Sequence, residues 1–162
     1  MDIKCTQSPF GAEKDRWFMQ EALTEARAAF DHQEVPIGAI VVDANGTIIG
    51  RGANAVERLH TQSAHAELLA INQAGDHLRD WRLNDCWIYV TLEPCPLCMN
   101  LIYLSRLTGV IFGAASPLFG YRLDNLHADQ VYRKAMVLVK EGVCADESAQ
   151  LLKQFFNQRR NE

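Results

Sequence analysis

Two short groups of residues carry side chains that can bind a metal ion. His65 and Glu67 are separated by a single alanine, and Cys95 and Cys98 are separated by two residues. One histidine and two cysteines suit zinc, and three protein ligands leave the fourth tetrahedral position free for water. A structural zinc site would normally need a fourth cysteine or histidine. The pattern therefore predicts a catalytic zinc centre made by His65, Cys95 and Cys98.

The expected helix start at Pro96 should favour metal binding by the two cysteines. Proline is common in the first turn of a helix, and the spacing of Cys95 and Cys98 places both on one side of that turn. The positive end of a helix lowers the pKa of a thiol, and the thiolate is the form that binds metal. Zinc in turn lowers the pKa of its bound water to roughly 7. Glu67 is placed to take a proton from that water and deliver it to the substrate and the leaving group.

Each group also has an ordinary interpretation when taken alone. Cys95 and Cys98 could form a thioredoxin-like redox pair, His65 could be a structural histidine, and Glu67 could be a solvated helix residue. Together they form the pattern His-x-Glu followed by Pro-Cys-x-x-Cys, which is characteristic of zinc deaminases. The combination favours the zinc site over these alternatives.

Hydrophobic periodicity predicts the elements that hold these residues. Helices are expected over 13–31, 63–73 (ended by Gly75), 96–106 and 145–157, and strands over 37–42, 47–52, 86–91, 110–112 and 136–139. Asn45 and Gly46 indicate a hairpin between the first two strands. Residues 113–125 are expected to be irregular. This order predicts a single α/β domain over residues 1–162, a three-layer α-β-α fold with a central mixed five-stranded sheet.

Composition and charge limit the class of protein. The chain has 162 residues, 48% of them hydrophobic, and no apolar run of the roughly 20 residues that a membrane span needs. We expect a cytoplasmic protein in which the five cysteines are reduced. A net charge of −4 argues against nonspecific electrostatic binding of nucleic acid over a broad surface, although several basic residues occur in the last 30 residues. These are Arg133, Lys134, Lys140, Lys153, Arg159 and Arg160.

The chain resembles the cytidine-deaminase superfamily and, within it, the bacterial tRNA adenosine deaminases. The resemblance covers roughly residues 17–160 and rests on segments 34–39, 64–67, 89–95, 110–114, 145–147 and 155–160, together with Asn54. It implies that His65, Cys95 and Cys98 bind one Zn²⁺ per subunit and that Glu67 is the proton donor. It further implies that Asn54 contacts the flipped nucleoside. Asn54 could equally stabilise a loop turn.

The resemblance also implies a substrate and an assembly. Members of the family deaminate adenosine to inosine at the wobble position of the tRNA anticodon loop, where an unpaired base costs little to flip out. They are homodimers, which would explain why the helix expected over 96–106 has almost no polar face.

The segment after Ala114 departs from the family pattern. Where tRNA deaminases usually have a charged, glycine-containing stretch, residues 115–123 are mostly apolar. Leu118, Phe119 and Tyr121 could stack on splayed bases, close over a free base, or pack against a dimer partner.

Two other functions therefore stay open. One is deamination of a free nucleobase or nucleoside such as guanine or cytosine, and the other is a non-catalytic zinc-binding or redox module. The roles of Cys5, Cys86 and Cys144 are not predicted beyond ordinary packing.

Overall fold

A mixed sheet forms the centre of the computed structural model, which describes residues 2–4, 7–123 and 137–162. The strands are β1 (Asp2–Lys4), β2 (Gly38–Val42), β3 (Ile48–Ala53), β4 (Trp87–Leu92), β5 (Gly109–Ala114) and β6 (Val137–Glu141). They lie in the order β1-β6-β5-β4-β2-β3, and β2 pairs antiparallel with both of its neighbours while the other pairs are parallel. The five predicted strands are confirmed, and β1 adds a short sixth strand at one edge.

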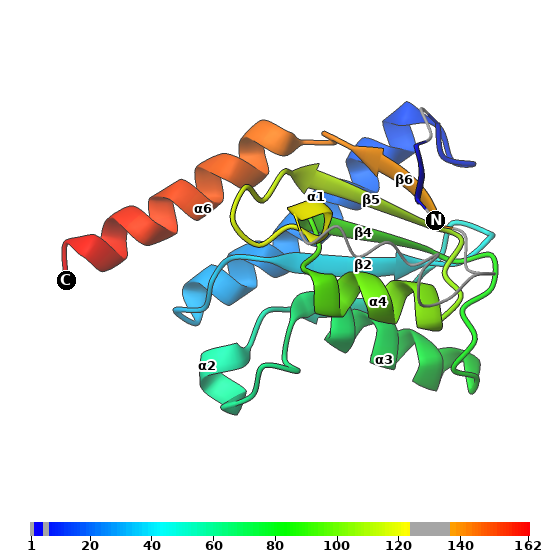
Figure 1. Ribbon diagram of the computed structural model, residues 1–162, viewed down its shortest axis with the longest axis horizontal. Coiled ribbons are helices and arrows are strands. Elements are labelled where there is room, and N and C mark those ends of the chain that lie inside the picture. The colour runs from blue at the N-terminus through cyan, green and yellow to red at the C-terminus, as the bar shows by residue number, and fades with distance from the viewer. Residues whose placement is uncertain (1, 5–6, 124–136) are drawn as a thin grey trace.

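Helices cover both faces of this sheet (Figure 1). One face carries α1 (Ala12–Asp31) and α6 (Ala145–Arg160), and the other carries α3 (Ala66–Leu78) and α4 (Pro96–Leu104). Alternate residues of each strand point to opposite faces, so Ile40 packs in the core beneath α1 while Val41 packs in the core beneath α3. The predicted three-layer α-β-α architecture is confirmed.

Glycines in the hairpin allow the helices to lie very close to the sheet. A Cβ atom on Gly52 would lie 2.1 Å from the Ala66 carbonyl oxygen in the first turn of α3. On the opposite face, a Cβ on Gly38 would lie 2.0 Å from the Ala22 carbonyl oxygen of α1. Only glycine permits such an approach of backbone to backbone. The start of α3 is thereby placed directly over the end of β3.

The second predicted helix differs from the observed one at both ends. The helix α3 begins at Ala66 because His65 is an extended N-cap residue (ψ 147°), and it continues past Gly75 to Leu78. One glycine costs a helix only about 1 kcal/mol, and the buried Ala70 and Ala74 pack this helix against the sheet. The helix ends instead at Leu78, because the C-cap residue Arg79 adopts a left-handed conformation (φ 53°).

Other differences are small. The helix α4 ends at Leu104, two residues before the predicted end. A short helix α2 (Val56–Leu59) occurs where the sequence predicted no element, and a 3-10 turn η1 (Tyr121–Leu123) lies in the segment predicted to be irregular. The predictions that involve Cys5, Arg133 and Lys134 lie outside the described residues.

Candidate metal centre

Two helix starts meet at one end of the sheet. Because β3, β4 and β5 run in the same direction, their carboxyl ends share one edge, where ligands of α/β proteins commonly bind. His65 is the N-cap residue of α3, and Cys95 is the N-cap residue of α4. Figure 1 shows α3 and α4 side by side, starting at the same end of the sheet.

The three predicted ligands lie close together. The Nδ1 atom of His65 is 3.3 Å from the Cys98 Sγ and 3.6 Å from the Cys95 Sγ, and all three ligand atoms are within 4.8 Å of one another. Tetrahedral zinc with Zn–N near 2.0 Å and Zn–S near 2.3 Å requires an N···S separation of about 3.6 Å. The two separations between His65 Nδ1 and the cysteine sulfurs are therefore close to what a His-Cys-Cys zinc site requires.

The two thiols differ in acidity. The pKa of Cys95 is lowered to about 4, first by a hydrogen bond with the Cys98 side chain and further by hydrogen bonds with His65 and with the Cys98 amide. The pKa of Cys98 is raised, because the Cys95 thiolate and burial both disfavour a second negative charge. The Cys98 amide in the first turn of α4 therefore stabilises a thiolate at Cys95, as expected for a cysteine at the start of a helix.

Glu67 lies in the first turn of α3, two residues from His65. Its side chain is only 4% exposed, and burial raises the pKa of its carboxyl group to about 7. A carboxyl group with a pKa near neutrality can both accept and release a proton. The geometry places such a group beside the ligand cluster.

Asn54 follows the last residue of β3 and is buried. Its Nδ2 donates to the Val35 carbonyl oxygen at 3.2 Å, and the neighbouring Ala55 amide donates to the Ala64 carbonyl oxygen at 3.0 Å. The second contact holds the Asn54 segment against the residue before His65. Within the described ranges, no hydrogen bond is made by the Asn54 Oδ1, so this acceptor is open to a ligand.

Glu93 organises the loop beside the centre and was not predicted from the sequence. Its buried carboxylate accepts hydrogen bonds from the Ser116 amide (2.9 Å) and from Arg122 Nε (2.9 Å). Arg122 also bridges to Glu141 at the end of β6 (2.6 Å). A buried carboxylate needs such partners, but these lie 23 and 29 residues further along the chain, so no local pattern indicates them.

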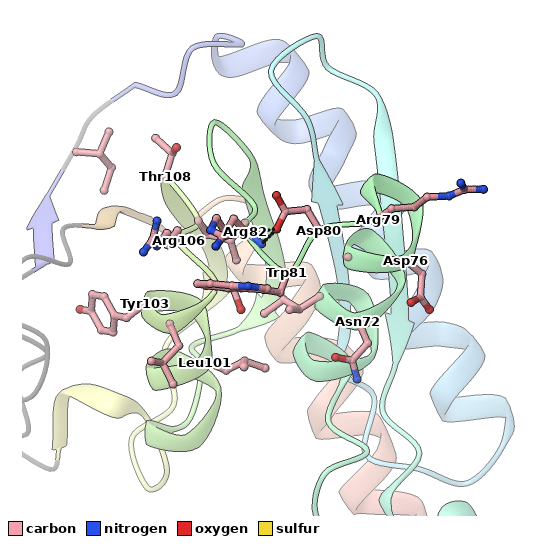
Figure 2. A pocket seen from close by; sticks show the side chains of 16 residues that line it. Asn72, Asp76, Arg79, Asp80, Trp81, Arg82, Leu101, Tyr103, Arg106 and Thr108 are labelled. Carbon is pink, nitrogen blue, oxygen red and sulfur yellow. Dashed lines mark hydrogen bonds and ion pairs between the residues drawn. The ribbon is translucent and has the colours of Figure 1, made fainter.

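A separate groove lies at the opposite ends of α3 and α4. Figure 2 shows Trp81 between Asn72 of α3 and Leu101 of α4, and Asp76 and Arg79 also line this groove. The guanidinium groups of Arg82 and Arg106 lie 4.4 and 5.2 Å from the Trp81 ring centroid. Its volume of about 2040 Å³ exceeds the roughly 300–1,000 Å³ of small-molecule sites.

The remaining described cysteines lie apart from this centre. Cys86 is buried, and burial raises the pKa of its thiol to about 11. Cys144 accepts a hydrogen bond from Gln20 at 3.6 Å. Of the residues that the structure describes, His65, Cys95 and Cys98 are the one group placed to hold a metal ion.

No helix among the described residues is long and apolar enough to cross a membrane.

Comparison with known proteins reveals similarity along most of the chain. Residues 12–114 match the family described as the cytidine and deoxycytidylate deaminase zinc-binding region. The tRNA-specific adenosine deaminase of Streptococcus pyogenes is 40% identical over 159 residues, covering 94% of this chain and 96% of that protein. The similarity thus extends well beyond the zinc-binding region.

Two solved structures are also similar. One comes from biochemical and structural studies of A-to-I editing by tRNA:A34 deaminases, with a TM-score of 0.75, 35% identity and coverage of 83% of this chain and 98% of that one. The other is guanine deaminase from Bacillus subtilis, with a TM-score of 0.59, 31% identity and coverage of 72% and 73% respectively. Similarity in fold therefore includes both an RNA-directed and a free-base deaminase.

Proposed function

The chain belongs to the cytidine and deoxycytidylate deaminase family of zinc-binding enzymes, and we propose that it converts adenosine to inosine at the wobble position of a tRNA anticodon loop. The observation that carries the proposal is the His-Cys-Cys cluster with buried Glu67, in a chain that is 40% identical over nearly its full length to a tRNA-specific adenosine deaminase. Residues 1–162 would act as one deaminase domain.

His65, Cys95 and Cys98 would hold one zinc ion per subunit. When bound, zinc supplies an activated water as the nucleophile for hydrolytic deamination. The thiolate favoured at Cys95 and the helix start around Cys98 provide the negative charge and the fixed geometry that the ion needs.

Glu67 would carry the proton through the reaction. Hydrolysis forms a bond between the water oxygen and C6 of adenine and breaks the bond from C6 to the amino nitrogen, releasing ammonia. The Glu67 carboxylate accepts one proton from the attacking water and passes it to the ring nitrogen. It then takes the remaining proton from the new C6 hydroxyl group and delivers it to the leaving amino group, which departs as ammonia. Its buried position keeps solvent from competing for that proton.

Asn54 would orient the nucleoside. Because its Nδ2 is held by the Val35 carbonyl oxygen, the side-chain amide has a fixed direction. Its Oδ1 then accepts a hydrogen bond from a base or ribose donor. This interaction would bind substrate without taking part in the proton transfers.

The test is inosine formation in tRNA, detected by mass spectrometry after incubating the zinc-loaded protein with total bacterial tRNA. Free adenine, guanine, cytosine and their nucleosides serve as parallel substrates, and the Glu67→Ala protein serves as the inactive control. Inosine at the anticodon wobble position is the expected product. Absence of inosine from every tRNA would refute the assignment.

A second function, deamination of a free base such as guanine, is favoured by the 31% identity to a guanine deaminase over 72% of the chain. The zinc centre and Glu67 would act identically, and only the substrate would change. Conversion of guanine with no product from tRNA would establish this alternative.

The α4 helix supports a homodimer. Leu97, Leu101 and Leu104 follow the i, i+4, i+7 spacing of one helix face, and Leu97 and Leu104 are 53% and 46% exposed in the single chain. Leu101 and Leu104 also line the groove of Figure 2. A second copy packed on this face would bury these leucines, in a helix that the sequence predicts to have almost no polar face.

Sedimentation tests the dimer. The wild-type protein should have the mass of two chains, and Leu104→Glu should shift it toward one, whereas Leu59→Glu, at a similarly exposed leucine of α2, should not. A wild-type mass of one chain would contradict the proposal. For a tRNA-modifying enzyme, we also propose a cytoplasmic location.

A further inference from the structure

The loop after β5 presents an exposed apolar tip. Leu118 and Phe119 are 75% and 73% exposed, more than any other large hydrophobic residue in the described parts of the chain. Solvent exposure of two adjacent large apolar side chains is unfavourable, so binding of a ligand or partner that covers them would be favourable. Neither side chain belongs to the zinc cluster or to the α4 face.

Both sides of this tip are attached to the protein. On one side the buried Glu93 carboxylate accepts a hydrogen bond from the Ser116 amide, and on the other it accepts one from Arg122 Nε. Gly120 lies directly on this carboxylate, since a Cβ there would be 2.4 Å from the Glu93 carboxyl carbon. The tip is therefore held at a defined place, as a binding platform must be.

That place is beside the metal centre. The Tyr121 amide donates to the Pro94 carbonyl oxygen at 2.9 Å, and Pro94 immediately precedes the ligand Cys95. The strands β4 and β5, which lead into Cys95 and into this loop, are neighbours and parallel. Figure 1 shows η1, which ends the loop, close to the start of α4.

We propose that Phe119, supported by Leu118, is a stacking platform for a nucleotide flanking the target adenosine. The inference rests on the proposed function, since it requires a substrate that extends beyond the metal centre. A free base bound at the zinc cluster has no attached neighbours, whereas an anticodon loop carries further bases on both sides of the target adenosine. Unpaired bases in RNA are commonly bound by stacking on aromatic side chains.

The charge of the protein favours stacking over phosphate contacts. With a net charge of −4, the chain has little long-range attraction for RNA. The one basic side chain described in residues 115–122 is Arg122, and it is engaged by Glu93 and Glu141. Stacking contributes affinity that does not depend on counterion release.

Binding and turnover of an anticodon stem-loop test the platform. Phe119→Ala should weaken binding about 5- to 150-fold, as expected for the loss of one base–aromatic stack. The slope of affinity against salt concentration should not change, because no phosphate contact is removed. At saturating substrate, kcat should stay close to wild type, so the effect is on KM. Trp17→Ala removes another exposed aromatic side chain (53% exposed) from α1, on the opposite face of the sheet from α4, and should have no effect.

A fluorescent base provides a direct readout of stacking. Stem-loops carrying 2-aminopurine on the 5′ or the 3′ side of the target are mixed with zinc-loaded Glu67→Ala protein, which binds without conversion. One of the two probes should be quenched on binding, and the Glu67→Ala protein that also carries Phe119→Ala should lose that quenching.

Three outcomes separate the possible failures. Unchanged affinity and unchanged quenching for Phe119→Ala would refute the platform while leaving tRNA deamination intact. If the wild-type protein sediments as two chains and Phe119→Ala sediments as one chain with unchanged RNA affinity, the tip is a subunit contact. That result would overturn the inference. Wild-type protein that converts free guanine but neither binds nor converts RNA would refute the proposed function itself.

Discussion

Replacing Gly52 with alanine should disrupt the zinc centre without changing any ligand. A Cβ at this position would lie 2.1 Å from the Ala66 carbonyl oxygen and 2.8 Å from the Ala70 amide nitrogen. Because ordinary contact begins near 3.4 Å, the first turn of α3 must move by about 1.3 Å. His65 is the N-cap residue of that helix and would move with it.

The expected effect follows from the tolerances of metal sites. Zinc–ligand distances are held to about ±0.2 Å, so a displacement of about 1.3 Å removes His65 from productive coordination. Overpacking of this kind costs about 1–3 kcal/mol of folding stability. Misplacement of a catalytic group by about 1 Å costs activity about 10²-fold. Gly52→Ala should therefore fold, bind zinc weakly and lose most activity.

Chelator competition measures the zinc affinity, and thermal unfolding with and without zinc measures how far the metal stabilises the protein. Gly75→Ala is the matched control, since a Cβ there meets only the Asp80 carbonyl oxygen at 3.4 Å. It should retain zinc and gain up to about 1 kcal/mol of stability, because alanine is the better helix former. Equal zinc affinity and activity in Gly52→Ala and wild type would refute the claim that this glycine positions α3.

Other substitutions separate chemistry from stability. Glu67→Gln should lower kcat about 10²- to 10⁴-fold while retaining zinc, because the amide cannot carry the proton. Single-turnover inosine formation measures the rate, and metal analysis measures the zinc content. Loss of zinc would contradict this role. Asp15→Ala leaves the ammonium group of Lys140, 2.6 Å away, without its buried partner, and should cost about 3–5 kcal/mol in urea unfolding with little change in the zinc affinity of the folded protein. Arg122→Ala leaves the buried Glu93 carboxylate short of one partner and should cost about 1–3 kcal/mol, reduced from a fully buried pair because Arg122 is partly exposed. The KM of Arg122→Ala for RNA should also rise. Unchanged stability together with unchanged KM would show that Arg122 does not hold the loop after β5 in place.

The chemistry of the centre could be predicted from the sequence because it depends on short-range features. The spacing of Cys95 and Cys98 within one helical turn, and of His65 and Glu67 at the start of another, determines ligand type and local direction. Strand and helix alternation was sufficient to predict the layers. These properties need only residue identity and periodicity.

Only the tertiary structure decided how the two helix starts meet and what surrounds them. Gly52 sets the approach of α3 to the sheet through a contact with Ala66 that local sequence does not encode. Glu93 was missed because its partners are 23 and 29 residues away. The predicted C-terminal end of α3 was wrong because packing of its alanines on the sheet outweighs the helix-breaking tendency of Gly75. Long-range contacts of this kind depend on which strands become neighbours, and that is determined by the folded chain as a whole.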